Sequence, residues 1–266
     1  MFKKLRMNGR RAIVPFLTAG YPDIPRFYSI LRRVAKVSDC IEIGVPFSDP
    51  LADGRTIQDA SQVAIREGMT LHRLMDELGD HFSDIQTPVL LMTYLNPIFQ
   101  YPLDSFLDRC RRLGIAGIII PDLSFEESST FRDILADCRQ ECASDQRSRI
   151  ETEDTVIPVI QFISPATREE RLKRIVSVAE GFLYVVSITG TTGSRNSLPE
   201  DTQDYLKRVR QITDKPLCLG FGISGPRQIQ EYRELVDGFI VGSAILERIN
   251  SGEDPADFIN HLRSYL

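Results

Sequence analysis

Short apolar runs rich in β-branched residues recur along the whole sequence, and longer amphipathic stretches separate them. In the first of these stretches, Phe27, Ile30, Leu31 and Val34 keep helical spacing, while the arginines fall on the other face. A strand followed by a helix, repeated eight times within about 250 residues, predicts an α/β fold of the (β/α)8 TIM-barrel type. The eight runs are AIVPF from Ala12, CIEIG from Cys40, VLLMTY from Val89, GIIIP from Gly117, VIQFI from Val159, FLYVVS from Phe182, PLCLG from Pro216 and GFIVG from Gly238.

The chain of 266 residues has the length of one such barrel, so we expect a single domain over residues 1–266. Two features interrupt the repeat. The gap after the second strand has room for two extra helices, over residues 56–66 and 71–82. The charged segment 139–155 has no apolar periodicity, and we expect a surface insertion there, between the fourth helix and the fifth strand.

Composition and charge exclude several classes of function. The formal net charge is −5, which argues against binding to nucleic acid or to an anionic membrane, because both need a basic face. No apolar segment is long enough for a membrane span or a signal peptide, so we expect a cytoplasmic protein. The five cysteines are scattered and only three histidines are present, which favours buried thiols over a metal site or a disulfide framework.

A carboxylate interrupts the second apolar run, IEIG. Side chains of a barrel strand alternate between the barrel interior and the helix layer, so Glu42 points inward if Ile41 and Ile43 face the helices. Glu42 also lies near the C-terminal end of its strand, where barrel enzymes assemble their sites. Burial raises the pKa of an unpaired carboxyl group toward neutrality, as acid–base catalysis requires. The alternative is a structural glutamate that pairs with a cation or a neighbouring strand.

Two aspartates follow in the loop PFSDPLADG. The plain interpretation of Asp49 and Asp53 is turn chemistry, and Asp53 suits the N-cap of the helix that follows it. The prolines make the loop rigid, however, so it can also direct one carboxylate into the barrel mouth and leave the other for a partner surface.

Glycine-rich loops follow the last three strands, in ITGTTGSRNS, GFGISGP and VGSAIL. Glycine at a strand exit is ordinarily a turn, but three successive loops of this kind at helix N-termini favour an anion site. Apolar residues near the strand ends form either the upper layer of the barrel core or an apolar pocket. They are Phe16, Met92, Ile119, Tyr184 and Phe221.

Seven segments together resemble the tryptophan synthase α subunit family in order and spacing. The resemblance runs from about Ala12 to the C-terminus, apart from the insertion at 139–155, and PFSDPLADG is its most specific element. The segments are VPFLTAGYPD, IEIGVPFSDPLADG, TYLNPIF, IIIPDLSFEES, GFLYVVSITGTTG, GFGIS and DGFIVGSAIL.

The resemblance implies a carbon–carbon lyase that cleaves indole-3-glycerol phosphate to indole and D-glyceraldehyde 3-phosphate by a retro-aldol step. It gives Glu42 the role of catalytic acid and base. Asp53 accepts a hydrogen bond from the indole N–H, and Tyr184 has a supporting role. The phosphate positions are Gly193, Gly222, Gly242 and Ser243, and the indole pocket is Phe16, Ile57, Met92, Ile119 and Phe221.

The resemblance also implies a β-subunit partner in an α2β2 complex, which receives indole through a tunnel. The pyridoxal phosphate belongs to that partner, and no cofactor or metal is expected on this chain. Asp49 and Asn96 match positions that face the β subunit, and TTGSRNS resembles a lid that closes over the substrate.

Three positions depart from the family pattern, namely Arg55, Ser124 and Thr191, which stand where proline, proline and valine are usual. Arg55 matters most, because a cation beside Asp53 would lower the pKa of that carboxyl group. Arg55 therefore leaves open the alternative that the chain is a degenerate subunit, which has lost the lyase activity and only binds and activates the β subunit. Another phosphate-binding barrel, such as an isomerase of indole or anthranilate metabolism, would explain the glycine loops but not PFSDPLADG.

Overall fold

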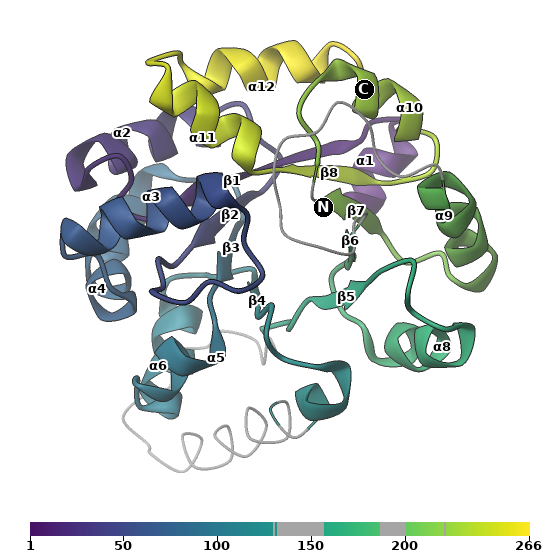
Figure 1. Ribbon diagram of the computed structural model, residues 1–266, viewed down its shortest axis with the longest axis horizontal. Coiled ribbons are helices and arrows are strands. Elements are labelled where there is room, and N and C mark those ends of the chain that lie inside the picture. The colour runs from purple at the N-terminus through teal and green to yellow at the C-terminus, as the bar shows by residue number, and fades with distance from the viewer. Residues whose placement is uncertain (130, 132–156, 187–200, 221) are drawn as a thin grey trace.

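The computed structural model describes residues 1–129, 131, 157–186, 201–220 and 222–266. In these ranges eight parallel strands form one sheet in the order β4-β3-β2-β1-β8-β7-β6-β5 (Figure 1). The strands are β1 Ala12–Thr18, β2 Ile41–Gly44, β3 Val89–Met92, β4 Gly117–Ile119, β5 Gln161–Ile163, β6 Leu183–Val186, β7 Leu217–Gly220 and β8 Gly238–Val241.

The two ends of this sheet meet and close it into a barrel. The N–H of Ile118 in β4 donates to the oxygen of Pro158 (2.9 Å), and the N–H of Ile160 donates to the oxygen of Ile118 (2.9 Å). A parallel bridge joins Ile118 to Val159, just before β5. The predicted (β/α)8 barrel is therefore confirmed, whereas the single domain over 1–266 stays a prediction.

Helices surround the strands on the outside of the barrel (Figure 1). The two extra helices predicted after β2 are confirmed, and the segment 139–155 lies outside the described residues. The helices are α1 Phe2–Met7, α2 Ile24–Ala35, α3 Arg55–Arg66, α4 Leu71–His81, α5 Leu95–Phe99, α6 Leu103–Arg112, α8 Glu169–Val178, α9 Asp201–Ile212, α10 Pro226–Tyr232, α11 Ser243–Asn250 and α12 Pro255–Arg263, with a 3-10 turn at Phe82–Asp84.

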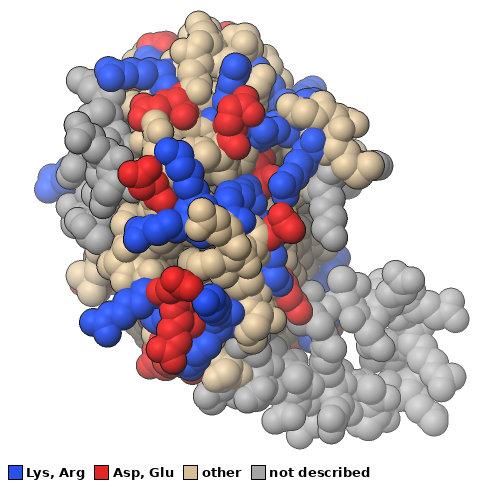
Figure 2. Space-filling view, turned by 90° about the vertical axis from the view of Figure 1, so that its right-hand side faces the viewer, with Lys and Arg blue, Asp and Glu red and all other residues tan. Residues whose placement is uncertain are grey.

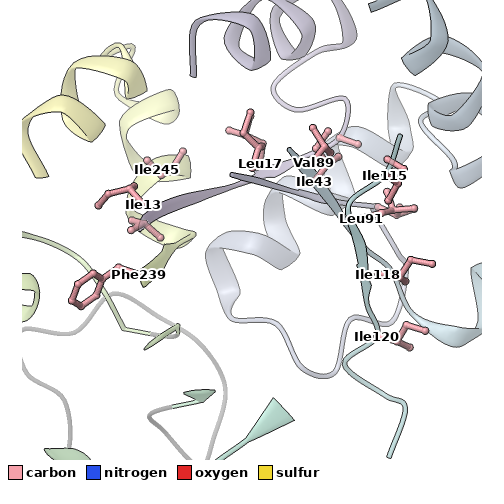
Figure 3. Close-up of a cluster of buried hydrophobic side chains, with 14 of the residues drawn as sticks. Ile13, Leu17, Ile43, Val89, Leu91, Ile115, Ile118, Ile120, Phe239 and Ile245 are labelled. Atoms are coloured by element: carbon pink, nitrogen blue, oxygen red, sulfur yellow. The ribbon is translucent and has the colours of Figure 1, made fainter. Parts of the chain in front are cut away.

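Alternation along the strands divides the buried side chains into two layers. One cluster lies between the strands and the helices and contains Ile41. It also contains Ile43, which is labelled in Figure 3. The other lies inside the barrel, and Glu42 points toward it because its two neighbours face outward. The predicted direction of Glu42 is thus confirmed. The strand residues of the inner cluster are Ala12, Val14, Phe16, Leu90, Met92, Ile119, Tyr184, Cys218 and Ile240.

Glycines at two strand ends make room for the largest inner side chains. A Cβ atom on Gly44 would lie 2.4 Å from Cζ of Phe16, and one on Gly220 would lie 2.5 Å from Cε1 of Tyr184. Both rings therefore lie against a neighbouring backbone at the upper end of the barrel. This close approach sets the shape of the space around Glu42.

The opposite end of the barrel is closed by packing and by buried ion pairs. The side chain of Phe2 in α1 packs on Phe182, with ring centroids 5.2 Å apart. Asp39 accepts from the N–H of Ile13 (3.0 Å) and from Nη2 of Arg263 (2.6 Å). In the same way Asp237 accepts from the N–H of Leu217 (2.8 Å) and from Arg210. These contacts stabilise the N-terminal ends of the strands, away from Glu42.

We expect Gly44→Ala to lower the free energy of unfolding by about 1–3 kcal/mol, because the added methyl group overlaps the ring of Phe16. Urea unfolding measures the change. Gly79→Ala is the control, because Gly79 is inside α4, where alanine is favoured, and its Cβ would meet the far end of the Arg109 side chain at 3.1 Å and Leu113 at an ordinary contact distance of 3.8 Å. Equal effects of the two substitutions would contradict the prediction.

Candidate active site

Glu42 is a buried carboxyl group that has no counter-charge among the described residues. Its neighbours in register are Phe16 on β1 and Leu90 on β3, and its side chain is 0% exposed. Neither carboxyl oxygen has a hydrogen-bond partner among the described residues. Burial, and secondarily the charge of Asp53, raises the pKa of Glu42 to about 8. Glu42 is therefore mostly protonated at neutral pH, and the alternative of a structural glutamate paired with a neighbour does not hold within this part of the chain.

Asp53 lies in the loop between β2 and α3, and its side chain is 5% exposed. Helix α3 takes Gly54 as its N-cap, so the N-cap interpretation of Asp53 is wrong. Instead, Oδ2 of Asp53 accepts a hydrogen bond from the hydroxyl of Tyr94 at 3.0 Å. Burial raises the pKa of Asp53 to about 6, and the bond from Tyr94 acts in the opposite direction.

Tyr184 is a third buried acidic side chain near Glu42 and Asp53, and it comes from the far side of the barrel. It lies on β6, its ring is buried in the inner cluster, and it is paired in register with Cys218. Burial raises its pKa well above the usual value, and the charges of Glu42 and Asp53 add to that effect. The three acidic groups therefore share one space of low polarity, and only Asp53 is mostly ionised near pH 7.

Arg55 does not act on Asp53. It is the first residue of α3, its side chain is exposed, and its Nε lies 3.0 Å from a carboxylate oxygen of Asp59 one turn later. Ser124, the second departure, caps a helical turn, because its hydroxyl donates to Glu127 (2.6 Å) and accepts from the Glu127 N–H (3.2 Å). Thr191 lies outside the described residues.

The structure brings four of the predicted pocket residues together. Phe16, Ile57, Met92 and Ile119 all belong to the inner cluster, while Phe221 lies outside the described residues. Ile57 reaches this cluster from α3, which lies beside α11 (Figure 1).

Three of the four predicted phosphate residues, Gly222, Gly242 and Ser243, follow β7 or β8. Gly222 has φ +92°, a conformation that favours glycine, and Gly242 is the N-cap of α11, which begins at Ser243. A Cβ atom on Gly242 would lie 3.6 Å from both Ile57 and Phe16, so this helix terminus borders the apolar cluster. Gly193 lies outside the described residues, as does the TTGSRNS segment.

A pocket of about 400 Å³ opens between the loops that follow β4 and β5. Ala52, the neighbour of Asp53, lines it, together with Ile160 and Phe162 from the inner side of the barrel. Its volume is that of a site for a small organic molecule. The pocket therefore borders the loop that carries Asp53, although Glu42, Asp53 and Tyr184 do not line it themselves.

The two predicted partner-facing residues, Asp49 and Asn96, are exposed. Each has an exposed apolar neighbour, because Leu51 is 87% exposed and Phe99 is 65% exposed. Apolar side chains this exposed are typical of a contact surface when they cluster.

Tyr94 is the residue of the acidic group that the sequence analysis missed. Its motif, TYLNPIF, predicts only a partner surface, through Asn96. The signal was available in the alternation, since Tyr94 lies two residues beyond Met92, which faces the barrel interior.

A closed (β/α)8 barrel with two buried carboxyl groups at its upper end, one protonated and one ionised at neutral pH, defines a barrel enzyme of the acid–base type. The family model described as "Tryptophan synthase alpha chain" matches residues 2–264. The chain belongs to this family.

Individual relatives agree with the family model. The tryptophan synthase alpha chain of Nitratidesulfovibrio vulgaris is 41% identical over 258 residues, which cover 97% of this chain and 94% of the relative. That of Thermoanaerobacter pseudethanolicus is 38% identical over 266 residues, covering 100% and 95%. A solved structure of Mycobacterium tuberculosis tryptophan synthase aligns with a TM-score of 0.84 at 28% identity, covering 99% and 95%. Tryptophan synthase subunit alpha from Legionella pneumophila aligns at 0.80 and 31% identity, covering 99% and 95%.

We expect Glu42→Gln to raise the free energy of unfolding at pH 8 by roughly 1–3 kcal/mol and to change it little at pH 5. The folded-state pKa of Glu42 lies above the unfolded value, so the unfolded chain loses this proton first and the wild type becomes less stable as pH rises from about 4.5 to about 8. Urea unfolding across this range measures the difference. The exposed Glu180→Gln is the control, and parallel pH profiles for Glu42→Gln and wild type would contradict the assignment.

Proposed function

We propose that this chain cleaves indole-3-glycerol phosphate to indole and D-glyceraldehyde 3-phosphate, the activity that its family membership implies. The observation that carries the proposal is the state of Glu42. Both oxygens of its carboxyl group are buried and have no partner among the described residues, and the pKa of the group is about 8. Such a group can give a proton to a carbon atom near neutral pH and take one back.

The reaction then needs one proton donor and one acceptor. Protonated Glu42 transfers its proton to C3 of the indole ring, which leaves a cationic ring. The bond from C3 to the glycerol chain breaks, and its electron pair returns to the ring. The hydroxyl proton on the departing carbon passes to the ionised Glu42 as the aldehyde forms, so the side chain ends the cycle protonated. No cofactor is required, because the ring itself accepts the electrons.

Asp53 is suited to stabilise the positive charge on the ring. Its Oδ2 is occupied by Tyr94, whereas Oδ1 is buried and lacks a partner among the described residues. An ionised oxygen of this kind accepts a hydrogen bond from the ring N–H, and the bond strengthens as the ring becomes cationic. Tyr184 supports Glu42 from β6 as a neighbouring buried hydroxyl.

The remaining substrate groups match the surroundings of this pair. The apolar ring fits against Phe16, Ile57, Met92 and Ile119. The phosphate group fits the backbone N–H groups at Gly222, Gly242 and Ser243, because a helix N-terminus favours an anion, while the fourth expected phosphate residue, Gly193, lies outside the described residues.

We also propose that the chain acts with a tryptophan synthase β subunit, which carries the pyridoxal phosphate and receives the indole in an α2β2 complex. Exposed Leu51 and Phe99, beside Asp49 and Asn96, support a docking surface around the barrel mouth.

On the face shown in Figure 2, basic and acidic side chains are interspersed, which differs from the basic surface that nucleic acids need. Within the described ranges no helix is long and apolar enough to cross a membrane.

We expect Glu42→Gln to lower the rate of indole release by at least about 10³-fold, because the amide can neither give nor take the proton. Single-turnover assays with indole-3-glycerol phosphate, with and without β subunit, measure the rate, and Glu180→Gln serves as the control.

In wild type, kcat/KM should fall below about pH 6, where Asp53 is protonated, and above about pH 8, where Glu42 loses its proton. A wild-type chain that activates the β subunit but releases no indole would contradict the lyase and identify a degenerate subunit.

We expect Leu51→Ser and Phe99→Ser each to weaken binding to the β subunit by about tenfold, because each removes an exposed apolar contact from the docking surface. Titration calorimetry with purified β subunit measures the affinity. Met7→Ser is the matched control, because Met7 is 86% exposed but lies at the end of α1, on the opposite side of the barrel. Unchanged affinity in both test variants would contradict the proposed surface.

A further inference from the structure

Tyr94 lies between β3 and helix α5, which carries the proposed partner-facing residue Asn96, and its hydroxyl reaches the buried Asp53. It follows β3 after one intervening residue, Thr93, and is almost fully buried. Its ring stacks on Phe47 of the loop after β2, with centroids 5.1 Å apart and an interplanar angle of 29°. The packing of the ring fixes the position of the hydroxyl beside Asp53 and Ala52.

The direction of each hydrogen bond at this hydroxyl follows from its partners. The backbone N–H of Ala52 can only donate, and it lies 3.1 Å from the Tyr94 oxygen, which therefore accepts. The hydroxyl proton remains for Oδ2 of Asp53 at 3.0 Å. The chain of donors from Ala52 to Tyr94 to Asp53 ends on a carboxylate oxygen, and such a chain favours the ionised form of that carboxylate.

We propose that Tyr94 is a positioning residue, whose hydroxyl holds one oxygen of Asp53 and thereby keeps the other oxygen an ionised acceptor directed at the substrate ring. The use of that second oxygen rests on the proposed function. The hydrogen bond itself and its effect on Asp53 do not depend on it.

The charges around Asp53 leave this task to Tyr94. Glu42 from β2 and Tyr184 from β6 face Asp53, and both are acids. Asp122, from the loop after β4, faces Tyr94 and accepts from the N–H of Leu95 (3.0 Å). Arg55, the nearest cation in sequence, pairs with Asp59 instead.

Burial would protonate Asp53 in such surroundings. Among the described residues, the hydrogen bond from Tyr94 is the one contact that lowers its pKa. Without that bond the pKa of Asp53 would rise toward that of Glu42, which narrows the pH range in which Asp53 is ionised while Glu42 keeps its proton.

Tyr94→Phe in the complex with the β subunit tests the proposal, because it removes only the hydroxyl and keeps the ring stacked on Phe47. We expect the acid limb of kcat/KM to move upward from about pH 6 by about one unit, so that activity falls about fivefold at pH 6 and hardly at all at pH 8. A purely structural role would lower activity equally at all pH values. Tyr101→Phe, in the same loop region, is the matched control and should leave the profile unchanged.

A second measurement separates this inference from the proposed function. The carboxyl carbon of Asp53, labelled with ¹³C, is titrated by NMR in wild type, in Tyr94→Phe and in Tyr101→Phe, without substrate. A higher pKa of Asp53 in Tyr94→Phe alone supports the inference even if wild type cleaves no indole-3-glycerol phosphate. An unchanged Asp53 titration together with an unchanged acid limb would overturn it, and a lyase that remains active would leave the proposed function intact.

Discussion

The carboxyl group of Glu42 is enclosed in the barrel with no counter-charge in the part of the chain that the structure describes, and the rest of the site depends on that enclosure. An ionised carboxylate in such a place is costly, so the group keeps its proton up to a pKa of about 8. The same burial that disfavours the charged form makes Glu42 a proton donor at neutral pH. Stability and chemistry therefore oppose each other at this position, and the neutral isostere should stabilise the fold while it removes the reactivity.

The barrel tolerates this group because its other parts are well satisfied. The outer layer of Ile41, Ile43 and their neighbours packs the strands against the helices (Figure 3). At the N-terminal ends of the strands, Asp39 and Asp237 are paired with arginines and backbone N–H groups. Stabilising contacts thus gather at one end of the barrel. Toward the other end lie both oxygens of Glu42 and Oδ1 of Asp53, which have no partner among the described residues and which a substrate can satisfy.

Much of this arrangement could be predicted from the sequence, with physical reasons for the successes and the errors. The strands, the two helices after β2 and the inward direction of Glu42 followed from periodicities of two and 3.6 residues, which are properties of a local segment. Asp53 suited an N-cap, yet the helix uses Gly54, because burying Asp53 against Tyr94 provides a better partner. Arg55 raised the possibility of a cation beside Asp53, but Asp59, one helical turn away, pairs with it.

The sequence by itself determined the barrel, its inward-facing acid and the family to which the chain belongs, since alternation and motif spacing are written in consecutive residues. Only the tertiary structure decided which oxygen of Asp53 is held and which is left open. That choice depends on Tyr94, which lies 41 residues further along the chain and on a different strand end. Hydrogen bonds between loops depend on how the strand ends converge in space, and no local pattern records that geometry.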